Sequence, residues 1–130
     1  NKKKGINQII DMQKKKTGKL FNFCLNAVGI IANKNLKVQT SLRNLGEDIG
    51  LLFQLTDDFL DFKGSKKIVG KSIKKDAKKG KSTLINVMGY ENAFNYANKL
   101  KKNILLKIKK HGKNTSDLTD TIEFILGRNF

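Results

Sequence analysis

The sequence contains no proline, a single cysteine and only two arginines. One cysteine, Cys24, can form neither an intramolecular disulfide nor the ligand set of a zinc cluster, which fits a reducing compartment such as the cytoplasm. We expect Cys24 to be a small core residue. No apolar run approaches the ~18 residues of a membrane span. The chain starts without methionine or a signal-type apolar stretch, so we expect that an amino-terminal portion precedes it.

Acidic residues are also scarce, with 11 Asp+Glu against 27 Lys+Arg and a net charge of +16. Such a surplus raises the alternative of a basic helical module that binds nucleic acid. The surplus is nearly all lysine, whereas base readout in the major groove favours the planar fork of arginine. Abundant asparagine and isoleucine without proline is what A/T-rich coding produces. We therefore favour a compositional origin of the charge over a dedicated nucleic-acid surface.

The chain has 130 residues, of which 38% are hydrophobic, and this length suits one domain with a real core. Apolar residues recur at three- and four-residue steps with no strand alternation, which predicts an all-α fold. A first helix of about 25 residues is expected, followed by a turn at 33–35. Its apolar row is Ile6, Ile9, Ile10, Gln13, Thr17, Leu20, Cys24, Ala27, Val28 and Ile31.

A second long amphipathic helix is predicted over about 36–63, with Gly64 ending it. Its apolar row is Val38, Leu42, Leu45, Ile49, Leu52, Thr56, Phe59 and Leu60. A lysine-rich connection with little core of its own then covers about 64–81. Three further helices are expected: a short one from near Ser82 to Gly89, a longer one ending around His111, and a last one capped by Thr115 or Ser116. Their apolar rows contain Leu84, Ile85, Val87 and Met88, then Ala93, Ala97, Leu100, Ile104 and Ile108, and finally Leu118, Ile122 and Ile125.

The second helix carries a polar face opposite its apolar row. It consists of Arg43, Glu47, Gly50, Gln54, Asp57 and Asp61, with Asp58 beside it. Three carboxylates within one helical turn repel one another, which is unfavourable unless a cation binds them. Mg²⁺ commonly joins one or two carboxylates to a substrate phosphate, and the lysines that follow could neutralise that phosphate. The alternative is a solvated acidic edge, the usual fate of a charge run.

These residues resemble motifs of the trans-isoprenyl diphosphate synthase (polyprenyl synthetase) family. The run Phe53-Gln54-Leu55-Thr56-Asp57-Asp58-Phe59-Leu60-Asp61 is similar to the second aspartate-rich motif of that family. Upstream, Lys16-Thr17-Gly18-Lys19-Leu20 resembles the family's Lys-Thr element, and downstream Gly70-Lys71 and Asp76–Leu84 resemble its GK…D…GK-[ST]-T segment. The ending Ile125–Phe130 is similar to that of bacterial short-chain farnesyl diphosphate synthases.

The resemblance implies a prenyltransferase that condenses an allylic diphosphate with isopentenyl diphosphate. Departure of the allylic diphosphate would give a carbocation, which the isopentenyl double bond attacks before a proton is lost. Asp57 would be the main ligand of Mg²⁺, with Asp58 and Asp61 orienting the metal or its waters. Contacts to the diphosphate would come from Lys16, Thr17, Gln54, Lys71 and Lys81.

One part of the family pattern has no counterpart in the chain: the first aspartate-rich motif. The resemblance therefore implies that residues 1–130 are the carboxyl-terminal half of the helical bundle, inactive alone and homodimeric in the full-length parent. A non-catalytic prenyl synthase subunit is a further alternative. Retention of Gln54, the three aspartates and the two downstream lysines argues against it.

Overall fold

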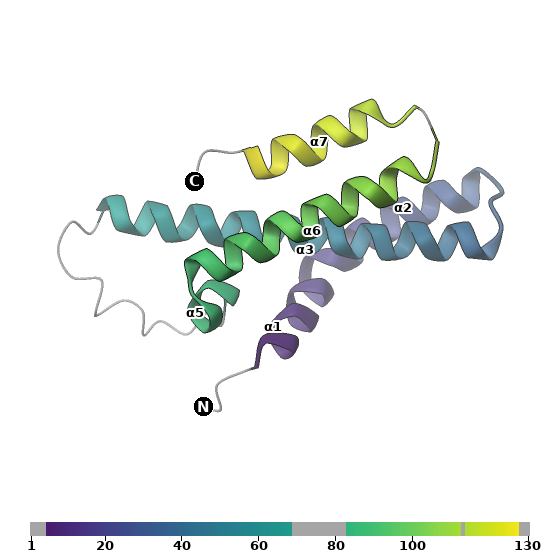
Figure 1. Ribbon diagram of the computed structural model, residues 1–130. Helices are drawn as coiled ribbons and strands as arrows, with labels where there is room; N and C mark the ends of the chain where they lie inside the picture. Colours follow the sequence, from purple (N-terminus) through teal and green to yellow (C-terminus); the bar gives the residue numbers. More distant parts are fainter. Residues whose placement is uncertain (1–4, 69–82, 113, 128–130) are drawn as a thin grey trace.

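A computed structural model of the protein describes residues 5–68, 83–112 and 114–127, and these ranges are helical, joined by short turns, as predicted (Figure 1). The helical elements in chain order are α1 (Ile6–Gln13), the π-helical η1 (Lys14–Gly18), α2 (Lys19–Ile31), α3 (Leu36–Ile68), α5 (Leu84–Met88), α6 (Tyr90–Lys109) and α7 (Ser116–Gly127). Across the described ranges, none of the helices has the length and apolarity needed to cross a membrane.

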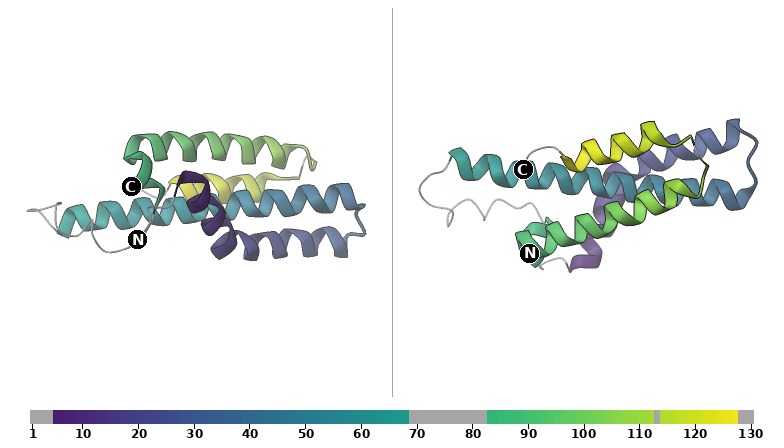
Figure 2. Two further views of the ribbon diagram at one scale, coloured as in Figure 1. Left: turned by 90° about the horizontal axis from the view of Figure 1, so that it is seen from below. Right: turned by 45° about the horizontal axis from the view of Figure 1, so that its top comes forward.

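The long helix α3 is the centre of the bundle, and every other described helical segment contacts it. α2 lies along one side of α3, while α6 and α7 lie on its other sides (Figure 2). A tight turn joins α2 to α3, with Asn33 at a φ of 50° and the Asn35 side chain accepting a 3.0 Å hydrogen bond from the Val38 backbone N–H. This confirms the predicted turn at 33–35, because asparagine tolerates the left-handed region and caps helix starts well.

The core follows the predicted rows on α3 and α6. On α3 the buried members of the predicted row are Leu45, Ile49, Leu52, Thr56 and Phe59, and on α6 they are Ala93, Ala97, Leu100, Ile104 and Ile108. From α7, Ile122 and Ile125 complete this core. Small alanines at the start of α6 let aromatic rings approach: Phe59 meets Tyr90 and Phe94 edge-on, with ring centroids 5.3 and 5.9 Å apart.

Two predicted boundaries differ from the structure. Gly64 does not end the second helix, because α3 runs through it to Ile68. Gly64 does not have a positive φ, and a glycine inside a helix costs only about 1 kcal/mol relative to alanine, which is too little to stop the helix by itself. The short helix starts at Leu84, where the Thr83 hydroxyl accepts a hydrogen bond from the Asn86 backbone N–H at 3.3 Å. The rest of the predicted connection, 69–82, lies outside the described residues.

The prediction of one buried row along the first helix is wrong in its second half. Ile9 and Gln13 are buried, but Leu20 and Ile31 are 65% and 80% exposed, and Cys24 is exposed rather than a core residue. The cause is η1, since a π-turn inserts an extra residue and rotates the following helix by about 100° relative to the preceding one. A different side of α2 therefore packs on α3.

Candidate functional site

The candidate site forms where η1 lies directly against the backbone of α3. A Cβ atom added at Gly50 would stand 2.5 Å from the Gly18 Cα, and one added at Gly46 would stand 2.5 Å from the Phe21 carbonyl oxygen. Glycine is therefore required at both positions for the two helices to approach this closely. Gly50, which the sequence placed on a polar face with Gln54 and Asp57, serves the contact between helices.

This close approach brings four polar side chains into one hydrogen-bonded chain. The Thr17 hydroxyl donates to the Gln54 Oε1 at 3.1 Å, and the Gln54 Nε2 donates to the Asp58 Oδ1 at 3.4 Å. From α1, the Gln13 Nε2 donates to the Asp58 Oδ2 at 2.7 Å. We call these four residues the Gln13–Asp58 network. It joins α1, η1 and α3, and it fixes the orientation of the Gln54 amide.

Burial raises the pKa of Asp58 above its ordinary value, and the negative charge of Asp61 adds to this effect. The hydrogen bonds from Gln54 and Gln13 and the positive charge of Lys16 act in the opposite direction. Lys16 lies on η1, close enough for its charge to act on Asp58, and its side chain is exposed to solvent.

Gln13 is a site residue that the sequence analysis missed, because it stood within an apolar row. It is 4% exposed, and its Oε1 is a buried acceptor with no hydrogen-bond partner within the described part of the chain. A lone amide at an otherwise apolar position is the signal that could have found it, since buried polar groups normally have partners.

Of the remaining predicted site residues, two lie within the described ranges and two lie outside them. Asp57 is half-buried and Asp61 is exposed, one helical turn apart on α3. Lys71 and Lys81 lie outside the described residues. The structure thus brings Thr17, Gln54 and Asp58 together, with Lys16 nearby, while the metal-ligand roles of Asp57, Asp58 and Asp61 remain predictions.

Mg²⁺ prefers oxygen donors, and α3 offers the carboxylates of Asp57, Asp58 and Asp61. In the ranges that the structure describes, no three or more His, Cys, Asp or Glu side chains are grouped so that they could enclose a metal ion. Both Asp58 oxygens already accept hydrogen bonds. The carboxylates of Asp57 and Asp61 fit a Mg²⁺ that takes its other ligands from water and a bound phosphate, which is the usual coordination of this ion.

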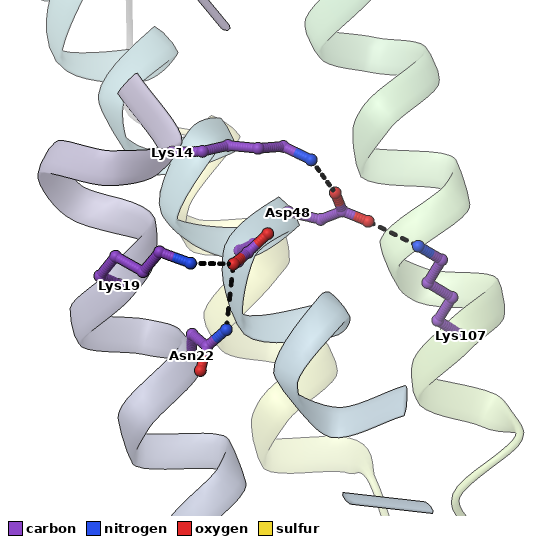
Figure 3. Close-up of polar contacts among 6 residues, drawn as sticks. Lys14, Lys19, Asn22, Asp48 and Lys107 are labelled. Atoms are coloured by element: carbon purple, nitrogen blue, oxygen red, sulfur yellow. Dashed lines mark hydrogen bonds and ion pairs between the residues drawn. The ribbon is translucent and has the colours of Figure 1, made fainter. Parts of the chain in front are cut away.

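Ion pairs link η1 and α6 to α3 (Figure 3). Asp48 on α3 pairs with Lys14 of η1 at 3.5 Å and with Lys107 of α6 at 2.6 Å. One turn of η1 and one of α6 are thereby tied to the same carboxylate. The sequence analysis found none of these pairs, because the partners are far apart along the chain.

A further ion pair joins α2 to α3. Glu47 accepts hydrogen bonds from the Lys19 ammonium at 2.7 Å and from the Asn22 amide at 3.1 Å (Figure 3). The bond from Lys19 is the main cause that holds the pKa of Glu47 below its ordinary value. Glu47 belonged to the predicted polar face, and the structure uses it for packing between helices.

Comparison with known proteins identifies the family. The polyprenyl synthetase family model matches residues 1–124. The chain belongs to the polyprenyl synthetase family. Its curated relatives include the farnesyl diphosphate synthase of Micrococcus luteus, 35% identical over 86 residues, which are 66% of the chain and 30% of that protein. The geranylgeranyl diphosphate synthase of Saccharolobus solfataricus is 40% identical over 79 residues, 60% of the chain and 24% of that protein.

Solved structures of polyprenyl synthetases agree with the fold. An FPP/GFPP synthase from Zymomonas mobilis superposes with a TM-score of 0.76 at 28% identity, covering 94% of the chain and 39% of that structure. A geranyltransferase from Helicobacter pylori, solved with magnesium and isoprenyl diphosphate, gives a TM-score of 0.70 at 27% identity, covering 98% and 42%. The recognition of the family and of its helical bundle from sequence is confirmed. The relatives make products of different lengths, and the chain spans only 24–30% of the two curated relatives above.

Proposed function

We propose that this polyprenyl synthetase chain is the carboxyl-terminal part of a prenyltransferase of the farnesyl diphosphate synthase type. Its substrates would be an allylic diphosphate and isopentenyl diphosphate. The observation that supports this best is the Gln13–Asp58 network, which links Thr17 of the Lys-Thr element to Gln54 and Asp58 of the aspartate-rich motif. Two motifs that lie 37 residues apart in sequence thus form one surface.

The proposed roles divide between carboxylates and donors. Asp57 holds Mg²⁺, with Asp58 and Asp61 orienting the ion or its waters. Lys16, Thr17 and Gln54 contact the allylic diphosphate, together with Lys71 and Lys81 from outside the described residues. When bound, Mg²⁺ would supply neutralisation of the negative charge on the diphosphate.

Lys16, Thr17 and Gln54 would contribute to diphosphate departure. Negative charge grows on the leaving oxygen during the reaction, so donors already fixed near it act selectively on the transition state. The Gln54 amide carries two N–H groups. One donates to Asp58, and the other would donate to a phosphate oxygen. Asp58 therefore orients Gln54. The long, exposed side chain of Lys16 would reach the phosphate and neutralise part of its charge as a point charge.

The chain by itself is proposed to bind a Mg²⁺–diphosphate weakly and not to elongate allylic substrates, because no first aspartate-rich motif is present in its sequence. The catalytically complete parent is proposed to be a cytoplasmic homodimer. Residues 1–130 form a single partial domain of it.

The test is a thermal-shift titration of the chain with Mg²⁺ and inorganic diphosphate, separately and together. Joint addition at 100 times the dissociation constant should stabilise the fold by about 2.7 kcal/mol, and neither component alone should do so. Asp57→Asn should abolish the joint effect. Asp120→Asn, an exposed carboxylate on α7, is the matched control and should leave it intact.

Two outcomes would contradict the proposal. Equal stabilisation of the wild type and Asp57→Asn by Mg²⁺ and diphosphate would show that Asp57 is not the metal ligand. Salt-dependent binding of duplex DNA without any response to Mg²⁺–diphosphate would support the basic nucleic-acid-binding module instead.

A further inference from the structure

Asp48 of α3 carries a largely buried carboxylate that has no role in the proposed chemistry. Its side chain is 14% exposed. The Oδ1 atom lies 3.5 Å from the Nζ of Lys14 on η1, and the Oδ2 atom accepts a 2.6 Å hydrogen bond from the Nζ of Lys107 on α6 (Figure 3). A carboxylate removed from water to this extent needs cations beside it, because burying an unpaired charge is costly. Asp48 therefore holds η1 and α6 at the same point of α3.

The three consecutive lysines of η1 lie in three different environments. Lys14 faces Asp48, whereas Lys15 forms an ion pair with Asp11 of α1 in which both side chains are more than half exposed. Lys16, whose charge reaches the candidate site, is exposed and has no ion-pair partner in the part of the chain that the structure describes. Lys16 is thus the lysine of this run that remains available to an anionic ligand.

The register of η1, meaning which of its side chains faces α3, depends on contacts outside the turn. η1 is a single π-turn, Lys14–Gly18, between α-helical segments, and such turns contain one inserted residue. Moving the insertion by one position would turn a side chain by about 100° about the helix axis. Two contacts with α3 oppose this change: that of Lys14 with Asp48 at the start of η1, and that of Thr17 with Gln54 near its end. The first of these contacts is tied to α6 as well.

We infer that Asp48 is a positioning residue for diphosphate binding. Its ion pairs with Lys14 and Lys107 fix the register of η1. That register directs Lys16 and Thr17 to the phosphate. The inference rests on the proposed assignment of these two residues as diphosphate contacts, and Asp48 acts through η1 without touching the ligand.

The sign of one effect separates positioning from simple electrostatics. Removing the negative charge of Asp48 from a protein of net charge +16 would strengthen anion binding by long-range attraction. Loss of the register weakens anion binding, because the donors no longer meet the phosphate.

Isothermal titration calorimetry of the 130-residue chain with inorganic diphosphate, in excess Mg²⁺, measures that sign. Asp48→Asn, which keeps the size of the side chain, should weaken binding about 10-fold, less than the roughly 100-fold that a misplacement of about 1 Å can cost. Asp11→Asn is the matched control, because it removes the same charge from an exposed pair with the next lysine of η1, and it should not weaken binding. Binding by Asp48→Asn that is as tight as that of the wild type, or tighter, would overturn the inference.

A double-mutant cycle asks whether Lys14 and Asp48 act as one unit. Lys14→Gln should also weaken binding, and the double variant Lys14→Gln/Asp48→Asn should bind like Asp48→Asn, because each change breaks the same contact. Independent charges give a different result, since the two single effects then have opposite signs and the double variant binds like the wild type. That result would contradict the positioning role.

Hydrogen–deuterium exchange of the chain without ligand tests the register directly. Asp48→Asn should speed exchange in η1 while the middle of α3 stays protected, and Asp11→Asn should not. If circular dichroism shows that Asp48→Asn loses its helices, Lys107→Gln replaces it, since the Lys107 side chain is 42% exposed and its loss leaves Asp48 paired with Lys14. Exchange in η1 equal to that of the wild type would overturn the inference. A wild type that binds no Mg²⁺–diphosphate refutes the proposed function, and with it the role of Asp48 in ligand binding.

Discussion

Gly50→Ala tests the contact between η1 and α3 on which the candidate site depends. The added Cβ would lie 2.5 Å from the Gly18 Cα and 2.8 Å from the Gly18 nitrogen, whereas ordinary Cβ contacts lie at 3.4 Å or more. Both neighbours are backbone atoms, so no side chain can turn away to relieve the clash. The two helices must separate by roughly 0.9 Å, the difference between those distances.

Two opposing effects set the size of the expected change. Overpacking of this kind lowers the free energy of unfolding by about 1–3 kcal/mol. Alanine in place of glycine in a helix raises it by up to about 1 kcal/mol. We expect a net loss of about 1–2 kcal/mol. Gly64→Ala on the same helix is the matched control, because nothing lies within 4 Å of its added Cβ. That substitution should stabilise the protein by about 0.5–1 kcal/mol.

Urea denaturation of the wild type and the two variants measures these differences at a constant m-value. The same separation would stretch the 3.1 Å bond between Thr17 and Gln54 beyond hydrogen-bonding distance. Gly50→Ala should therefore also weaken the joint response to Mg²⁺ and diphosphate, and Gly64→Ala should not. If both alanine variants were equally or more stable than the wild type, the backbone contact at Gly18 would not be as close as described.

Two further predictions concern the core and the ion pairs. Phe59→Ala should cost about 3–5 kcal/mol in urea denaturation, because Phe59 is fully buried against Tyr90 and Phe94; a cost below about 1 kcal/mol would contradict this packing. Glu47 has a pKa lowered from 4.5 by Lys19, so its stabilisation is present above pH 4.5 and is lost as the pH falls through its pKa in the folded protein. Glu47→Gln should flatten the acid limb of a stability–pH curve, and identical slopes for wild type and variant would refute the role of this pair.

The sequence by itself determined the helices and most of the core. The row on α6 and most of the buried positions on α3 were predicted, because an amphipathic helix needs only a three- to four-residue apolar period, which is local information. Leu51 and Leu55 of α3 are buried outside the predicted row. The family was also readable from sequence, since motifs such as Phe53–Asp61 resemble those of the family and the family model matches residues 1–124. Gly64 shows the limit of local signals, because the cost of one glycine, about 1 kcal/mol, does not end a long helix.

Only the tertiary structure decided how the first helix faces its neighbours and how the site is assembled. A π-turn at η1 changed which side of α2 meets α3, and no local pattern marked it. The bonds of Gln13 to Asp58 and of Thr17 to Gln54, like the ion pairs of Asp48, join residues of different helical segments that only packing brings together. Such contacts depend on the distance between two backbones, and a one-dimensional pattern carries no measure of that distance.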